Sequence, residues 1–204
     1  EAYNYFTDSE IAILSDITAS PLGIKHLFIK DPWGNIFEID EDDYCFINAN
    51  RITGGSNGVI IGVSDMVRSI KFYSELLDYD VVAFDTTDVF TDFGDIPGGK
   101  CKMRRVMLKR SKPVCGPLSD LMGTSHIELI QNLEIEGHKT LEGRWWGDPG
   151  FIHLCFDVRN MDKVHEAAKA LGHDFVCDSG DNFDMGDANG HFTYVEDPDG
   201  TLIE

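Results

Sequence analysis

The sequence predicts an α+β fold built from repeats of one small module, in which a strand and a helix are followed by three more strands. Two observations lead to this prediction. A strand-like alternation of apolar residues, followed by an amphipathic helix and further strands, occurs twice in the same order. The later part of the same pattern occurs once more near the start of the chain, and an Asp-Pro-x-Gly turn stands at equivalent places in two of the three copies.

The first copy, over residues 1–45, shows only the later strands of the module. Strands are expected over residues 11–14, 24–30 and 35–39, with no first strand or main helix before them. The Asp-Pro-Trp-Gly sequence at 31–34 favours a type I turn, and Glu38 follows four residues after its glycine. We expect the chain to be trimmed at both ends, since residue 204 also falls within a strand.

The second copy, over residues 55–133, is a complete module. Val59, Ile61 and Val63 alternate in its first strand, and Asp65 is placed to cap a helix over 66–77. The apolar stripe of this helix consists of Met66, Ile70, Tyr73 and Leu77. Its later strands are expected over 80–84, 102–109 and 126–130. This copy lacks the Asp-Pro-x-Gly turn, but Glu128 occupies the strand position equivalent to Glu38.

The third copy, over residues 148–204, repeats this order and is truncated at its last strand. Its first strand is expected over 151–158, and Asn160 is a suitable N-cap for a helix over 161–171 that Gly172 ends. Strands follow over 175–177 and 191–196. The Asp-Pro-Asp-Gly turn at 197–200 precedes a strand that ends at Glu204, again four residues after the glycine. Residues 40–57 and 132–150 are the expected linkers.

Composition excludes several classes of function. The formal net charge of the 204 residues is -19, which argues against binding nucleic acid or an anionic membrane, because both need clustered Lys and Arg. No apolar run approaches the ~18 residues of a membrane-spanning helix. The five cysteines are scattered and form no Cys-x-x-Cys pair, so we expect reduced thiols and a cytoplasmic location.

These motifs resemble the vicinal oxygen chelate superfamily, in particular its glyoxalase I-like members. The resemblance is carried by the Asp-Pro-x-Gly-x-x-x-Glu pattern that ends two copies and by the strand–helix order that opens two. It covers nearly the whole chain. It implies that modules pair into a curved mixed sheet, with helices on the outer faces and a polar cup between the paired modules. On this basis the modules that begin near residues 58 and 152 are expected to pair.

The resemblance also implies a metal site, because the family takes its ligands from the first and last strand of each module. Carried over to this chain, these positions are Gly58, Glu128, His153 and Glu204. Glycine cannot ligate a metal, so His153, Glu128 and Glu204 are the predicted ligands. Alternation supports them, since each lies on the face opposite its aliphatic strand neighbours. Such donors suit zinc, nickel, cobalt, manganese or ferrous iron. A strand histidine or a terminal glutamate, however, is more often structural than ligating.

Glu38 is expected to face a cup shared with a module that is absent or supplied by another chain, which makes a homodimer one arrangement to test. Four residues are candidates for contacting a small-molecule substrate: Arg144, Trp146, His126 and Tyr194. An Arg beside two tryptophans in the second linker could act as a lid over an anionic, partly apolar ligand. The competing interpretation is that the tryptophans only pin this linker to the sheets.

The leading functional prediction is a metal-dependent lyase or isomerase acting on a small hydroxy-carbonyl substrate, which could be thiol-conjugated, through an enediolate. Glu128 or Glu204 would remove the proton next to the carbonyl. The alternative is a metal-free small-molecule-binding protein of the bleomycin-resistance type, since one ligand position is a glycine. An extradiol-type dioxygenase ranks lower, because Gly58 stands at the first ferrous ligand position and Thr193 replaces the expected aliphatic residue before Tyr194.

Overall fold

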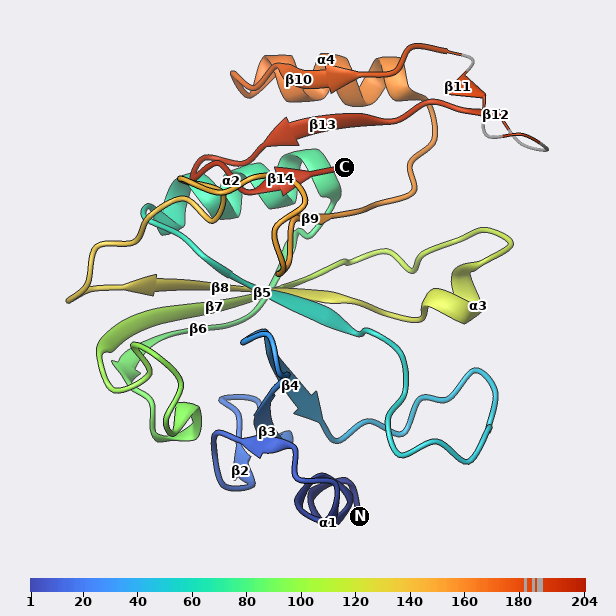
Figure 1. The fold of residues 1–204 in the computed structure, drawn as a ribbon. Helices are drawn as coiled ribbons and strands as arrows, with labels where there is room; N and C mark the ends of the chain where they lie inside the picture. The colour runs from blue at the N-terminus through green and yellow to red at the C-terminus, as the bar shows by residue number, and fades with distance from the viewer. Residues whose placement is uncertain (182, 185, 187–188) are drawn as a thin grey trace. The chain divides into compact units, whose positions relative to one another are not determined.

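The computed structural model of the chain describes residues 1–181, 183–184, 186 and 189–204. It divides into two compact units. The first unit comprises residues 1–66 and 79–137, and the second comprises residues 67–78 and 138–204. Both mix helices and strands, so the predicted α+β fold class is confirmed (Figure 1).

The N-terminal sheet of the first unit has four antiparallel strands and follows helix α1 (Ala2–Asp8). Strand β3 (Lys25–Lys30) pairs on one side with β1 (Ala12–Ile13) and β2 (Thr18–Ala19), and on the other with β4 (Ile36–Asp40). The predicted turn joins β3 to β4: the Asp31 carboxylate accepts the backbone N–H groups of Trp33 and Asn35. Gly34 has φ +94°, which favours glycine.

The second sheet of the first unit is mixed, with strand order β5-β8-β7-β6. Its strands are β5 (Gly58–Gly62), β6 (Val81–Val89), β7 (Lys102–Lys109) and β8 (His126–Asn132). β5 runs parallel to β8, and the other neighbours are antiparallel. β6 extends five residues beyond the end predicted for it, because β7 offers pairing partners up to Val89. The polar stretch from Asp85 to Asp88 gave no apolar alternation to reveal this extension.

The two sheets of the first unit share one core. Phe28 of β3 packs with Phe93, from the short 3-10 helix Thr91–Phe93 (η1), and with Met103 of β7. Leu14, Ile36, Ile60, Phe90, Ile96 and Ile130 surround them. The partial N-terminal module therefore packs against the middle module. Glu38 was expected to face a cup shared with a module that is absent or supplied by another chain, but it lines a cavity together with Lys109 and His126 of the middle module.

The second unit contains most of helix α2 (Met66–Leu77), helix α4 (Met161–Ala170) and a four-stranded sheet of order β10-β13-β14-β9. Its strands are β9 (His153–Leu154), β10 (Phe175–Asp178), β13 (Thr193–Glu196) and β14 (Leu202–Ile203), beside the small hairpin of β11 (Phe183–Asp184) and β12 (Asn189–Gly190). Both helices begin where the sequence predicts. β9 is shorter than predicted because its ladder with β14 covers two residues.

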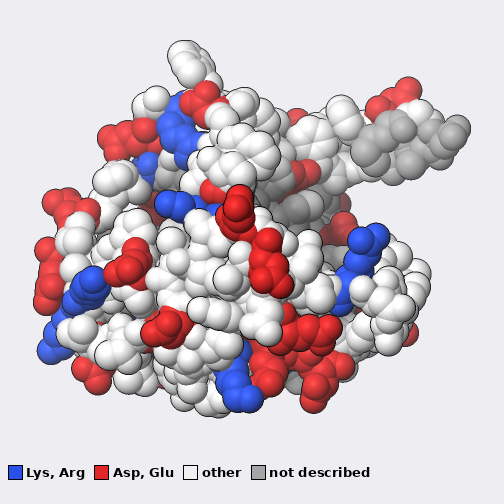
Figure 2. All heavy atoms as spheres, turned by 60° about the horizontal axis from the view of Figure 1, so that its bottom comes forward, with Lys and Arg blue, Asp and Glu red and all other residues white. Residues whose placement is uncertain are grey.

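The charged surface and the state of the cysteines follow the expectations from composition. Acidic side chains are scattered over the face shown in Figure 2, and basic ones occur there in a few separate places. All five cysteines are free thiols. Among the described residues, no helix combines the length and apolar character needed to cross a membrane.

Candidate functional site

A cavity of about 420 Å³ opens in the first unit. Acidic residues reach it from the end of β4 and the segment that follows: Glu38, Asp40, Glu41 and Asp42. Basic residues reach it from the end of β7 and the loop after it: Lys109, Arg110 and Lys112. His126, the first residue of β8, also lines it. The lining therefore carries both charges beside apolar residues such as Ile24, Met107 and Val114, which suits a small, partly apolar ligand with oxygen or anionic groups.

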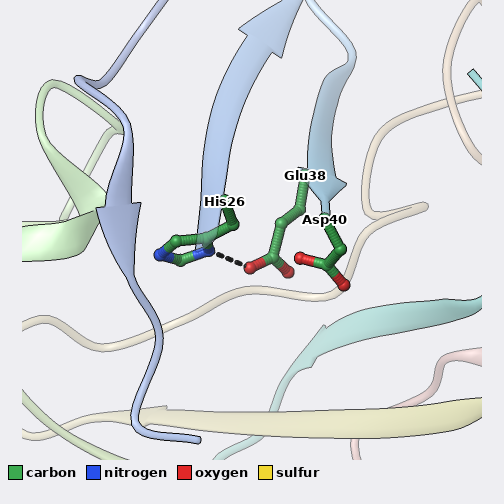
Figure 3. Close-up of side chains that lie close together, drawn as sticks. All are labelled: His26, Glu38 and Asp40. Carbon is green, nitrogen blue, oxygen red and sulfur yellow. Dashed lines mark hydrogen bonds and ion pairs between the residues drawn. The ribbon is translucent and has the colours of Figure 1, made fainter. Parts of the chain in front are cut away.

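His26, Glu38 and Asp40 form a cluster of metal-ligand type, in which one donor atom of each lies within 4.8 Å of the others. Strand register explains the cluster. His26 pairs with Asp40 and Phe28 with Glu38 across β3 and β4, so all four side chains project from one face. Nδ1 of His26 contacts Oε1 of Glu38, while the other ring nitrogen points away from both carboxylates (Figure 3). Glu38 and Asp40 line the cavity and His26 lies behind them.

A chain of buried charges continues from this cluster. Nε2 of His26 lies 3.3 Å from Oδ2 of Asp92, at ion-pair distance but without hydrogen-bond alignment. The same oxygen accepts a hydrogen bond from Nη1 of Arg105 at 2.6 Å, and Nε of Arg105 donates to Glu128 at 2.5 Å. Paired in this way, buried charges avoid the large desolvation cost of isolated ones.

The pKa values in this cluster follow from burial and pairing. Burial disfavours the charged form of His26, but Asp92 and Glu38 outweigh it and raise the pKa to about 9. Burial, followed by the charge of Glu38, raises the pKa of Asp40 above its usual range. Burial also raises the pKa of Glu128, and the guanidinium of Arg105 opposes that shift. Crowded carboxylates such as Glu38 and Asp40 are stabilised by a bound cation.

The three donors therefore fit a divalent metal. One imidazole and two carboxylates suit zinc, nickel, cobalt, manganese or ferrous iron, and the cavity beside Glu38 and Asp40 leaves room for water or substrate oxygens. A metal would compete with the proton that His26 carries, because only the neutral imidazole ligates.

His126 explains why residue 58 is glycine. A Cβ at Gly58 would lie 2.6 Å from Nε2 and 2.7 Å from the backbone oxygen of His126. The two residues are partners in the parallel β5–β8 ladder, and the histidine ring fills the space that a side chain at position 58 would need. Burial lowers the pKa of His126, which favours its neutral form. His126 is thus placed on a cavity wall, as a substrate-binding residue would be.

The second unit gathers four of the predicted site residues into one cluster. Nε2 of His153 lies 2.8 Å from Oε2 of Glu204, and the same oxygen accepts a hydrogen bond of 2.7 Å from the Tyr194 hydroxyl. The Trp146 ring stacks on His153 with centroids 5.7 Å apart and meets Tyr194 edge-on at 5.4 Å. Trp146 therefore does contact His153, whereas Trp145 is 83% exposed.

Arg144 is held by its own linker. Its guanidinium donates to the backbone oxygens of Thr140 and Pro149. Of the predicted metal ligands, Glu128 belongs to the first unit, and His153 and Glu204 to the second. The set of His153, Glu128 and Glu204 therefore stays a prediction, as do the roles of Glu128 and Glu204 as bases.

Sequence reasoning missed His26, Asp40, Asp92 and Arg105. No motif marks them, but one signal was present. The turn at residues 31–34 fixes the register of the strands on either side, and counting outward from it places His26 opposite Asp40. No comparable count leads to Asp92 or Arg105, because their positions depend on how the two sheets pack.

Comparison with known proteins identifies the family. Residues 55–204 match the sequence profile of the glyoxalase/bleomycin resistance protein/dioxygenase superfamily. The chain belongs to this superfamily. Among solved structures, glyoxalase I from Zea mays is 17% identical, with a TM-score of 0.53 over 98% of this chain and 60% of that one. A glyoxalase family protein from Bacillus cereus is 18% identical, with a TM-score of 0.54 over 77% of this chain and 95% of that one.

At these identities the likeness to solved structures shows the superfamily fold alone. The chain spans about 60% of the length of the Zea mays enzyme. Among curated proteins, none matches this chain.

Proposed function

We propose that this superfamily member is a metal-dependent lyase or isomerase of the glyoxalase type, with its reaction centre at the cavity of the first unit. One observation carries the proposal: His26, Glu38 and Asp40 form a ligand-type cluster whose two carboxylates line a cavity of about 420 Å³. The substrate would be a small hydroxy-carbonyl compound, which could be thiol-conjugated. Superfamily membership and the Zea mays glyoxalase I fold support this choice.

The residues around the cavity would have separate roles in binding the ion, moving the proton and orienting the substrate. His26, Glu38 and Asp40 would hold the ion, which when bound would supply a positive charge to stabilise an enediolate. Asp40 would also take the proton from the carbon next to the carbonyl, because its carboxylate lines the cavity in which the substrate would bind. His126 of β8 and Lys109 of β7, which also line the cavity, would orient the substrate.

A second candidate is a metal-free small-molecule-binding protein, and one observation favours it. The contact between His26 and Glu38, with an imidazole pKa of about 9, is an ion pair that balances charge in the cluster without any metal. In that case the same cavity would bind its ligand by hydrogen bonds and charge alone.

Metal analysis separates these candidates. Untagged protein purified without chelators should contain about one divalent ion per chain by elemental analysis, or take up one when titrated with zinc, nickel or manganese. Protein that neither retains nor binds any of these ions would rule out the metalloenzyme and leave the binding protein.

Histidine variants then locate the ion. His26→Gln should abolish tight binding, whereas His153→Ala should keep it. His191→Ala should keep it as well, because His191 belongs to the second unit and pairs there with Asp178 and Asp181. Loss with His153→Ala instead would move the centre to the predicted set of His153, Glu128 and Glu204.

A further inference from the structure

Asp92 is a buried carboxylate that lines no part of the reaction cavity. It lies on η1, its side chain is 7% exposed, and its Oδ2 lies between Nε2 of His26 and Nη1 of Arg105. A carboxylate in this place must have a partner of opposite charge, because unpaired burial would cost several kcal/mol. Both of its partners are cationic groups, and one of them is the imidazole of the proposed metal cluster.

Arg105 is fixed from several sides. Its side chain is 0% exposed, and it binds Asp92 and Glu128 with two different nitrogens. Its guanidinium carbon lies 4.1 Å from the ring centroid of Phe93 and 4.6 Å from that of Phe90, which adds cation–π attraction. A planar guanidinium held by two carboxylates and two rings has little freedom to turn. Arg105 therefore fixes the carboxylate of Asp92 in turn.

The orientation of the His26 ring follows from this arrangement. Nε2 faces Asp92, which leaves Nδ1 directed at Glu38 and the cavity side of the cluster (Figure 3). In metal sites, the histidine nitrogen that does not ligate usually faces a carboxylate, and this contact selects the ligating nitrogen. Here the contact is an ion pair of 3.3 Å, in which the charge of Asp92 favours the proton on Nε2. We infer that Asp92, held by Arg105, is a positioning residue that makes His26 bind the metal through Nδ1. The inference rests on the proposed function.

Nitrogen NMR of the unaltered protein tests the inference directly. Protein labelled with ¹⁵N-histidine is loaded with one equivalent of zinc, and the His26 signals are assigned by their loss in His26→Gln. The expected spectrum shows Nδ1 bound to zinc and Nε2 protonated. Zinc bound through Nε2 of His26 would overturn the inference while leaving the proposed metal site intact. Zinc that leaves both His26 nitrogens unchanged would overturn the proposed site as well.

The variant Asp92→Asn provides the second test. It keeps the shape of the side chain and removes its charge, and we expect zinc affinity to fall roughly 10–100-fold, as measured by competition with a chromophoric chelator. The matched control is Asp95→Asn, three residues away, whose side chain is 80% exposed and pairs with Lys100 on the surface. It should bind zinc like the unaltered protein.

Two further readouts separate positioning from mere support of the fold. In folded Asp92→Asn, positioning predicts that His26 loses its preference for Nδ1, whereas a structural effect alone would leave that preference unchanged. Unchanged zinc affinity in Asp92→Asn would also overturn the inference. If this variant does not fold, the NMR measurement on the unaltered protein decides by itself.

Discussion

At the scale of single residues, the position of the His126 ring in the first unit requires that residue 58 has no side chain. His126 takes the space beside Gly58, and both backbone and ring of the histidine would meet a Cβ there. The glycine that looked like a lost metal ligand is therefore required by packing. Its presence says nothing against a metal site elsewhere in the unit.

Replacing Gly58 with Ala should destabilise the protein by about 1–3 kcal/mol, because the added methyl group overpacks against His126. Urea unfolding followed by far-UV circular dichroism measures the change. Gly62→Ala is the control on the same strand, since a Cβ there meets nothing within 4 Å. Equal stability of the two variants would show that His126 is free to move aside.

His26 makes the stability of the metal-free protein depend on pH. Its pKa is raised from 6.5 to about 9, so the folded state binds the proton more tightly than the unfolded state. The stabilisation is fully present below pH 6.5 and is lost as pH rises to about 9. Its size is on the order of 3 kcal/mol.

The difference in unfolding free energy between the unaltered protein and His26→Gln, measured with a chelator present, should therefore shrink as pH rises through this window. A constant difference from pH 6 to pH 9.5 would contradict the raised pKa.

At the scale of elements, hydrogen bonds to Asp197 connect a helix of the second unit to the turn between its last two strands. The hydroxyl of Tyr73, on α2, donates a 2.7 Å hydrogen bond to Asp197, which begins the turn between β13 and β14. Asp197 also accepts the backbone N–H groups of residues 199 and 201. The turn motif thus has a structural role here: it ties a helix from the middle of the sequence to the last two strands.

Tyr73→Phe should lower the free energy of unfolding by about 1–2 kcal/mol, because it removes one partner of a buried carboxylate and leaves the ring in place. Tyr5→Phe, at a ring that is 48% exposed, is the control and should change stability little. Chemical denaturation of the two variants gives the comparison. An unaffected Tyr73→Phe protein would mean that the backbone N–H groups suffice for Asp197.

At the scale of the whole molecule, the dominant property is the net charge of -19. Like charges on a compact chain repel one another, and the repulsion is screened by salt over a distance that falls from ~30 Å at 0.01 M to ~8 Å at 0.15 M. The buried ion pairs around Arg105 are shielded from this screening by their burial.

The melting temperature of the chelator-treated protein should therefore rise between 0.01 M and 0.15 M sodium chloride. Differential scanning calorimetry at fixed pH measures the shift. A fall over the same range would mean that exposed ion pairs, such as Arg104 with Asp85, stabilise the fold more than the net repulsion destabilises it.

The sequence by itself determined the order of the main strands, both main helices, the Asp-Pro-x-Gly turns and the superfamily, because these depend on local periodicity and on turn residues. It also pointed to four residues that meet in the second unit: Trp146, His153, Tyr194 and Glu204.

Only the tertiary structure decided which modules share a core and which charges are buried between them. Packing of Phe28 against Phe93 and Met103 brings the N-terminal sheet to the middle one, and with it Asp92 and Arg105 to His26. Such contacts join residues distant in sequence, and apolar burial, which is non-directional, leaves no local pattern that specifies them.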